Sequence, residues 1–371
     1  MENQITLNLI VKYQSKALNT VTMSYKTGSI CMKVISVAFF LLFLQPVNAQ
    51  YNWGDLDAQL EAKQKILGND FVVMLWKGDT LVYKKERGTF NSKTQAPIAS
   101  CSKWLTAALV MQFVDEGKIS LDDKVSKYIP ELNKYFKGYI TFRDCLSHMT
   151  GIKDEGSFLK KIIQQKKFNT LEEEVNSYAA RDIRANTGTD FWYGSIGLNM
   201  AGRALEVMTK RKFDVLIRTK LLIPLGMRKT TFTNLEGGPV NPSGGAQSTA
   251  DDYMKFLVML LNKGKYNGVQ LLSENAVNEM IKIRTNPSII KYAPRAAQGF
   301  NYASGAWVVE EKDGKATVLA SPGLFGTWPM VDYCRGYTYL VFCKNLLGEE
   351  KADAYMQLKE VIDEQLKSTC Q

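Results

Sequence analysis

The chain has 371 residues, of which 45% are hydrophobic and 11% aromatic, a composition typical of a globular protein with a substantial core. Its formal net charge is +10, but the lysines and arginines are spread along the chain, and no basic block with interleaved aromatic residues stands out. We therefore expect no nucleic-acid partner.

The N-terminal extension, residues 1–49, contains the features of an export signal. The run MKVISVAFFLLFLQPVNAQ has a basic start at Lys33, an apolar core at residues 34–44 and a small-residue exit at Val47-Asn48-Ala49. This pattern predicts a signal peptide cleaved after Ala49, with Met32 as an alternative start. The core is shorter than the about 20 residues that span a membrane. We expect a periplasmic or secreted protein without a stable membrane span; the alternative is an uncleaved anchor.

Five cysteines follow the predicted cleavage site: Cys101, Cys145, Cys334, Cys343 and Cys370. An odd number leaves at least one free thiol, and the spacing indicates no metal site. Cys334 and Cys343 fall in neighbouring predicted strands and are candidates for a disulfide in an oxidising compartment. For most of the five we expect buried free thiols.

The predicted elements begin with a helix over 56–67, indicated by leucines at helical spacing. Two β-rich runs follow, joined at Gly78-Asp79 as a hairpin. From Ser102 to about residue 285 the pattern is helical, with capping boxes predicted at 141–144 and 248–251.

After Gly299 the pattern returns to strands, at 304–311, 315–321, 327–332 and 337–343. An amphipathic helix over 353–367 completes the chain. This order predicts an α/β protein of the α+β type, in which both chain ends build an antiparallel sheet, terminal helices pack on it and an α-rich region, residues 104–290, is inserted. No internal repeat or linker interrupts residues 50–371, which we therefore predict to be one domain.

Ser100 and Lys103 stand at the beginning of the apolar helix predicted after APIAS. Residues three apart lie on one face of a helix, about 5 to 6 Å apart, so the hydroxyl and the amine can meet. A serine hydroxyl needs a neighbouring base to act as a nucleophile, and burial favours the neutral amine that can serve as one. The N-terminus of a helix also offers N–H groups to an oxyanion.

The Ser-x-x-Lys spacing also occurs at Ser157 and at Ser288, so the spacing alone is weak evidence. Ser157 lies in a charged run and Ser288 follows a proline-marked loop, whereas Ser100 precedes a long apolar segment. A structural alternative remains for Ser100, in which it caps the helix and Lys103 extends into solvent.

A Ser-His-Asp mechanism is disfavoured because His148 is the only histidine and no Gly-x-Ser-x-Gly motif is present. A single histidine at the end of a helix is more typical of a structural hydrogen-bonding group. Histidine and cysteine do not cluster in a zinc-binding pattern, so we expect neither a metal nor a cofactor.

Further motifs accompany Ser100 and Lys103 in a fixed order: LSHMTGI (146–152), FWYGSIGLNMAGRALE (191–206), IPLGMRKT (223–230), GGAQSTADDYMKFLVMLLNKGKYNGVQLLS (244–273) and SPGLFGTWPMVD (321–332). With them the sequence resembles the serine β-lactamase and penicillin-binding-protein superfamily, in particular its branch of class C β-lactamases, DD-peptidases and esterases. The resemblance runs over most of residues 70–345.

The resemblance implies a serine hydrolase that forms an acyl-enzyme with an ester, amide or β-lactam-like carbonyl of a small-molecule or peptide substrate. Ser100 would be the nucleophile, Lys103 its base and Tyr193 the proton relay. The backbone N–H groups of Ser100 and Leu324 would form the oxyanion hole.

The sequence departs from the family pattern in its substrate-binding positions. Ser195 stands where the family has asparagine, and Ser321 replaces the lysine or histidine of the third motif, whose Gly323 is kept. Losing the charge-assisted part of a hydrogen bond costs on the order of 1 to 2 kcal/mol. We therefore expect esterase or peptidase-like activity rather than efficient β-lactamase activity. Lys291 and Arg295 are candidates to supply the missing charge, with surface solvation as the alternative.

The same departures suit a second hypothesis, a non-catalytic or acylation-only penicillin-binding or sensor domain of this fold. The sequence gives no indication of the oligomeric state.

Overall fold

The computed structural model divides the chain into two units, Met1–Gln50 and Tyr51–Gln371. The structure describes residues 51–154, 168–232, 238–346 and 351–370. The predicted signal peptide and the Ser157 motif lie outside the described residues. Among the described residues, no helix is both long and apolar enough to cross a membrane.

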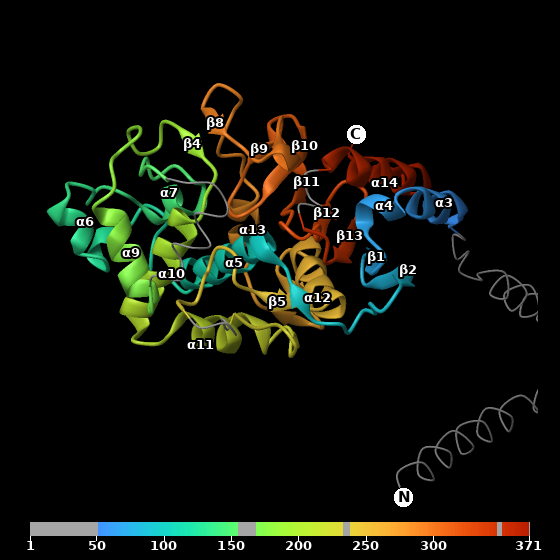
Figure 1. Cartoon of the computed structure of the whole chain (residues 1–371), viewed down its shortest axis with the longest axis horizontal. Helices are drawn as coiled ribbons and strands as arrows, with labels where there is room; N and C mark the ends of the chain where they lie inside the picture. Colours follow the sequence, from blue (N-terminus) through green and yellow to red (C-terminus); the bar gives the residue numbers. More distant parts are fainter. Residues whose placement is uncertain (1–50, 155–167, 233–237, 347–350, 371) are drawn as a thin grey trace, which may run out of the picture. The chain divides into compact units, whose positions relative to one another are not determined.

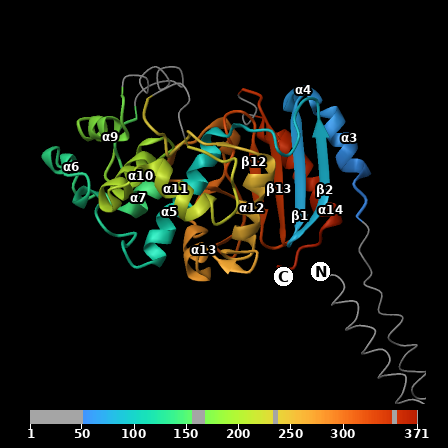
Figure 2. The same cartoon turned by 90° about the horizontal axis from the view of Figure 1, so that it is seen from below.

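A seven-stranded antiparallel sheet has the strand order β2-β1-β13-β12-β11-β10-β9. The strands are β1 Phe71–Lys77, β2 Thr80–Arg87, β9 Asn301–Tyr302, β10 Trp307–Lys312, β11 Lys315–Ala320, β12 Trp328–Asp332 and β13 Tyr337–Cys343. β1 and β2 form the predicted hairpin, and β1 pairs with β13, Phe71 opposite Cys343 (Figure 2). The sheet is thus built from both ends of the chain, which confirms the predicted fold class.

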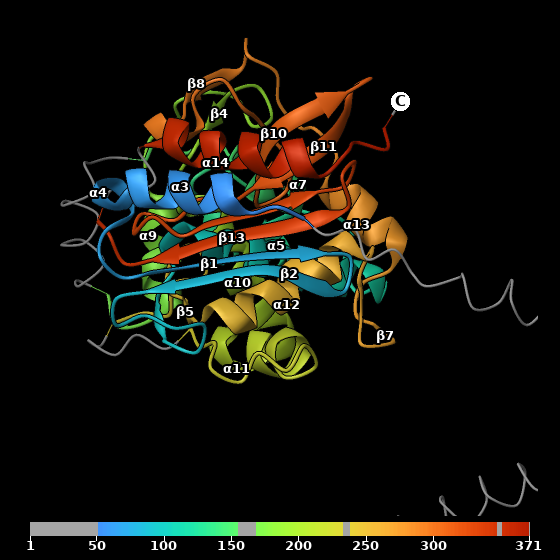
Figure 3. The same cartoon turned by 90° about the vertical axis from the view of Figure 1, so that its right-hand side faces the viewer.

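Both faces of the sheet are covered. Successive side chains of a strand point to opposite faces, so each strand contributes to two cores. Phe71, Val73 and Leu75 of β1 belong to a core shared with the terminal helices, whereas Val72 and Met74 face the core of the helical region. The terminal helices are α3 Gly54–Ala62, α4 Gln64–Leu67 and α14 Ala352–Gln365, and α3 and α14 lie side by side (Figure 3). The helix predicted over 56–67 is therefore two helices, divided at residue 63.

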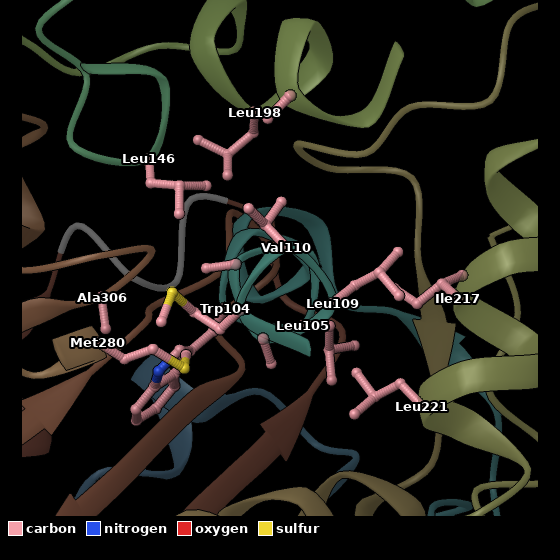
Figure 4. Close-up of a cluster of buried hydrophobic side chains, with 14 of the residues drawn as sticks. Trp104, Leu105, Leu109, Val110, Leu146, Leu198, Ile217, Leu221, Met280 and Ala306 are labelled. Atoms are coloured by element: carbon pink, nitrogen blue, oxygen red, sulfur yellow. The ribbon is translucent and has the colours of Figure 1, made fainter. Parts of the chain in front are cut away.

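The helical region lies on the opposite face of the sheet (Figure 1). Its helices are α5 Ser102–Asp115, α6 Glu131–Lys134, α7 Phe142–Leu146, α9 Leu171–Ala179, α10 Ile196–Thr209, α11 Phe213–Ile217, α12 Ala250–Leu261 and α13 Glu274–Met280. Short strands connect them: β3 Ala96–Pro97, β4 Phe191–Trp192, β5 Gln247–Ser248, β6 Lys265–Tyr266, β7 Val269–Gln270 and β8 Ile290–Tyr292. α5 is buried on nearly all sides, and Figure 4 shows its Trp104, Leu105, Leu109 and Val110 among the side chains of its neighbours.

One of the two predicted capping boxes is confirmed, and at the other position the cap is one residue later than predicted. Thr141 caps α7, since its hydroxyl accepts from the Asp144 N–H and the Asp144 carboxylate accepts from the Thr141 N–H. The predicted cap of α12, Ser248, instead pairs with Ala96 between β5 and β3. Thr249 is the cap of α12. The tertiary pairing of Ser248 thus takes precedence over its capping tendency.

The candidate pairing of Cys334 with Cys343 does not occur, because Cys334 is bonded to Cys370 with a Cα–Cα distance of 5.1 Å. Cys334 precedes β13 and Cys343 ends it, so at about 3.3 Å per residue the strand holds the two about 20 Å apart. A disulfide spans at most about 7 Å between Cα atoms. The thiols of Cys101, Cys145 and Cys343 are buried and free of disulfides, as expected for most of the cysteines.

An ionic cluster lies at the C-terminal end of α13. Glu279 accepts hydrogen bonds from Arg143 Nη1 at 2.9 Å and Arg284 Nη2 at 2.5 Å, and it forms an ion pair with Lys282. Burial raises the pKa of Glu279, but hydrogen bonds from the three basic side chains outweigh burial and lower the pKa to about 2. The cluster joins α7, α13 and the segment that follows α13.

Candidate active site

Ser100 lies in a 3-10 turn, Ala99–Cys101, directly before α5, and not in the first turn of α5 as the sequence suggested. Ala99 has φ of 45°, in the left-handed region that residues with a Cβ atom rarely adopt. The turn is held from both sides, because the Ser102 hydroxyl donates to Ala99 O at 2.5 Å and accepts from the Ala246 N–H at 3.0 Å. This turn presents Ser100, which is partly exposed, at the start of a buried helix.

Lys103 lies one helical turn beyond Ser100, and the structure brings the two side chains together. Lys103 Nζ is 3.1 Å from Ser100 Oγ and donates to the carbonyl oxygen of Ser243 at 2.8 Å. The lysine is only 4% exposed, so its amine contacts protein groups rather than bulk water. The alternative in which Lys103 extends into solvent is therefore wrong. Sequence reasoning missed Ser243, because a backbone acceptor carries no side-chain signal.

Tyr193 follows β4 and lies against the same lysine. Lys103 Nζ is 4.9 Å from the centroid of the Tyr193 ring. The ring packs on Trp307 and His148, with centroid distances of 5.1 Å and 4.7 Å. Its backbone N–H donates to Tyr292 O at 3.2 Å, which ties it to the segment of β8. Three residues predicted to act together, Ser100, Lys103 and Tyr193, are thus neighbours in space.

His148 stands behind Tyr193 in an aromatic cluster. Its Nε2 is 3.0 Å from the Tyr302 hydroxyl, and its ring meets Phe191 edge-on. Burial raises the pKa of Tyr302 well above its ordinary value, so this hydroxyl stays neutral. His148 is 5% exposed. A buried histidine bonded to a neutral phenol suits the structural role expected for it.

The loop between β11 and β12 passes against the Ser100 turn. The Ser321 hydroxyl donates weak hydrogen bonds to Ser100 O at 3.4 Å and Gly305 O at 3.3 Å. A Cβ atom at Gly323 would lie 2.3 Å from Ile98 O, so the approach of the two backbones requires glycine here. Ser321 and Gly323 therefore do lie beside Ser100.

Leu324 follows Gly323 in a turn closed by hydrogen bonds from Gly323 N to Thr327 O and from Gly326 N to Gly323 O, each 2.8 Å long. These two bonds do not use the Leu324 N–H. The position of the turn beside Ile98 and the Ser100 segment makes this N–H a candidate for the second oxyanion donor.

Among the described hydrogen bonds, none joins the remaining predicted residues, Ser195, Lys291 and Arg295, to Ser100 or Lys103. Ser195 precedes α10. Lys291 and Arg295 are exposed, and Lys291 Nζ donates to Ser288 O at 2.9 Å rather than to the serine hydroxyl. Within the described residues, no group of histidine, cysteine and acidic side chains is arranged to hold a metal ion.

A hollow borders the segment that carries Tyr193. Its lining includes His148, Asp154, Arg184, Trp192 and Gly194. The Arg184 guanidinium lies 3.4 Å from the centroid of the Trp192 ring. The sequence did not indicate this hollow, because its walls come from two separate segments, 148–154 and 184–197, which only the fold brings together.

The antiparallel sheet, the terminal helices on one face and the helical region on the other define a β-lactamase-like fold. The family model described as Beta-lactamase matches residues 56–361, and the chain belongs to that family. Beta-lactamase-like protein 2 of Dictyostelium discoideum is 24% identical over 279 residues. That similarity covers 64% of this chain and 50% of the other, so the chain spans about half the length of this curated relative.

Two solved structures share the fold. The crystal structure of a candidate beta-lactamase from Bacteroides dorei has a TM-score of 0.75 and 25% identity, covering 85% of this chain and 99% of the other. EstCE1, described as a hydrolase with promiscuous acyltransferase activity, has a TM-score of 0.68 and 17% identity, covering 83% and 96% of the two chains. These findings confirm the resemblance stated from the motifs.

Proposed function

We propose that the protein is a secreted serine hydrolase that forms an acyl-enzyme at Ser100, with Lys103 and Tyr193 as its proton-transfer groups. The observation that carries this proposal is the buried amine of Lys103, 3.1 Å from the Ser100 hydroxyl. If Ser100 only capped the helix, it would not need a nearly fully buried lysine beside it. A serine nucleophile, in contrast, needs a base at hydrogen-bond distance.

In the proposed reaction the neutral amine of Lys103 accepts the Ser100 proton while Oγ bonds to the substrate carbonyl carbon. The N–H groups of Ser100 and Leu324 stabilise the negative oxygen of the tetrahedral intermediate. Its collapse breaks the bond to the leaving group, which takes the proton through the Tyr193 hydroxyl. A water molecule then attacks the carbonyl carbon of the acyl-enzyme and gives its proton to the Tyr193 and Lys103 pair. Collapse of the second tetrahedral intermediate breaks the bond to Ser100 Oγ, which takes that proton back, and the acid is released.

The charges around Ser100 favour a substrate without a carboxylate. Ser321, in the position of the family's cation, offers a neutral hydroxyl, and its two weak bonds go to backbone carbonyls. Lys291 and Arg295 are exposed. We therefore propose esters or peptide-like amides of small molecules or peptides as substrates, in preference to β-lactams.

Export to the periplasm or the exterior is part of the proposal. It rests on the signal-peptide pattern of residues 1–49. The Cys334–Cys370 disulfide supports it, because disulfides persist in oxidising compartments and are rare in reducing ones.

A second candidate function is a penicillin-binding or sensor domain that is acylated without turnover, or not acylated at all. Ser195 and Ser321 favour this function, since both replace residues that the family resemblance implies to bind substrate.

Labelling and turnover assays separate these functions. The purified protein is incubated with a fluorophosphonate probe, a fluorescent penicillin and p-nitrophenyl esters, and the labelled residue is located by mass spectrometry. Label on Ser100 with ester turnover supports the hydrolase. Label without turnover supports the sensor, and no label on Ser100 with any of the three reagents refutes both acylation proposals. Ser100→Ala is the control for labelling elsewhere.

A further inference from the structure

The residue that holds the Lys103 amine is itself held by a buried asparagine. The Ser243 carbonyl accepts from Lys103 Nζ at 2.8 Å. The Ser243 N–H is shared between two acceptors, Asn199 Oδ1 at 3.0 Å and Asn241 Oδ1 of the same segment at 3.1 Å. Asn199 lies on α10 and is fully buried, and Ser243 is 1% exposed. One residue thus connects the side chain of Asn199 to the proposed base.

The orientation of the Asn199 amide is set from α9. Its Nδ2 donates to the Tyr178 hydroxyl at 3.2 Å and to Glu174 Oε1 at 3.4 Å. The Tyr178 hydroxyl in turn donates to Glu174 Oε1 at 2.6 Å. The oxygen and nitrogen of an amide differ in what they bond rather than in shape. Since α9 presents acceptors, the amide oxygen must face Ser243.

Asn199, Glu174 and Tyr178 are polar side chains in an otherwise apolar interface between α9 and α10, and burying them costs free energy. Glu174 is 6% and Tyr178 3% exposed, and burial raises the pKa of both side chains. Among the described residues, Glu174 Oε2 has no hydrogen-bond partner. Apolar residues often pack as well as, or better than, a buried polar network. Packing of α9 on α10 therefore does not explain why these groups are present.

We propose that Asn199 is a positioning residue for Lys103, which fixes Ser243 so that its carbonyl directs the lysine amine at the Ser100 hydroxyl. Glu174 and Tyr178 keep the Asn199 amide in the required orientation. This inference rests on the proposed role of Lys103 as the base. A neutral amine must aim its one lone pair at the proton that it removes, and a misplacement of about 1 Å can slow a reaction about 100-fold.

The groups facing Lys103 come from three segments: Ser100 from the turn before α5, Tyr193 from the segment after β4, and the Ser243 carbonyl. Beyond Asn199, the titratable and charged groups are Glu174 and Tyr178, with Arg181 over the Tyr178 ring at 4.6 Å and Asp154 paired to Arg181 at 3.6 Å. Loss of the Asn199 link weakens a carbonyl contact that favours the ammonium form, so the midpoint for acylation should move to lower pH.

The test compares Asn199→Leu and Tyr178→Phe with the parent protein, using the fluorophosphonate acylation rate between pH 5 and 10. Asn199→Leu should lower the plateau rate about tenfold and shift the midpoint down by about one pH unit. Tyr178→Phe keeps the ring and should have a smaller effect, about threefold. If Asn199→Leu does not fold, the pH profile of the acylation rate of Tyr178→Phe serves as the test of the proposal.

Glu206→Gln is the matched control, because Glu206 is also a buried polar residue of α10, 5% exposed, whose recorded hydrogen bonds go to the Phe213 N–H and Arg203. It should change stability without moving the pH profile. Parent-like pH profiles for both folded test variants would overturn the proposal.

A second readout keeps this inference separate from the proposed function. The Lys103 amine is titrated by NMR in protein labelled with ¹³C at lysine Cε, using Lys103→Met to assign the signal. A midpoint lowered in Asn199→Leu supports the positioning role even if the parent is never acylated, an outcome that would refute only the hydrolase. Superimposable Lys103 titrations would refute the positioning role even if Ser100 is acylated.

Discussion

Replacing Gly323 with alanine tests whether the β11–β12 loop supplies part of the oxyanion hole. The added Cβ atom would lie 2.3 Å from Ile98 O and 2.9 Å from Cys101 Sγ, and ordinary contact begins at 3.4 Å. The loop must therefore withdraw by about 1 Å, taking the Leu324 N–H with it. A misplacement of this size can cost about 100-fold in rate. Removal of an oxyanion donor costs about 100- to 1,000-fold.

The assay is the second-order rate of fluorophosphonate acylation, measured together with the melting temperature of each variant. We expect a loss of about 100-fold in Gly323→Ala with the fold retained. Gly54→Ala is the control: Gly54 begins α3, where an added Cβ meets one side-chain oxygen at 3.2 Å. A folded Gly323→Ala protein that acylates within about threefold of the parent would show that this loop does not position an oxyanion donor.

Three further predictions concern proton transfer, specificity and stability. Lys103→Ala and Tyr193→Phe should each slow acylation at least about 100-fold with the fold retained by circular dichroism, and a parent-like rate in either would disprove that residue's role. Ser321→Lys should raise kcat/KM for carboxylate-bearing esters about tenfold more than for matched neutral esters; equal effects would contradict the specificity argument. Glu279 has a pKa lowered to about 2 in the folded state, so its contribution is present above the unfolded pKa of 4.5 and lost as pH falls from 4.5 to 2. With partial solvent screening we expect about 1 to 2 kcal/mol of stability at pH 7 relative to Glu279→Gln. Urea unfolding at pH 7, 5 and 3.5 should show this difference shrinking with acid, and a difference independent of pH would refute it.

Short-range patterns predicted the sheet well. The hairpin of β1 and β2 follows from β-rich runs joined at a turn, and the strands after Gly299 from the same alternation. Local patterns were less reliable where a residue has two possible partners. Ser248 has the sequence of a helix cap, yet it pairs with Ala96. Cys334 is close to Cys343 in sequence, yet the length of β13 separates them and the C-terminal segment brings Cys370 within bonding distance.

The same division applies to the candidate site. Spacing on a helix predicted that Ser100 and Lys103 can meet, and the order of motifs indicated Tyr193, Ser321 and Gly323. Spacing did not predict that Ser100 precedes α5 in a turn stabilised by Ser102.

The sequence by itself determined the elements, the fold class and the chemical types at the site, because periodicity and spacing act over a few residues. Only the tertiary structure decided that the Ser243 carbonyl holds Lys103 and that Asn199 holds Ser243. These contacts join residues 140 and 44 positions apart, and both use backbone atoms of Ser243, which every residue shares. Their geometry exists only once α5, α10 and the segment before β5 have packed together.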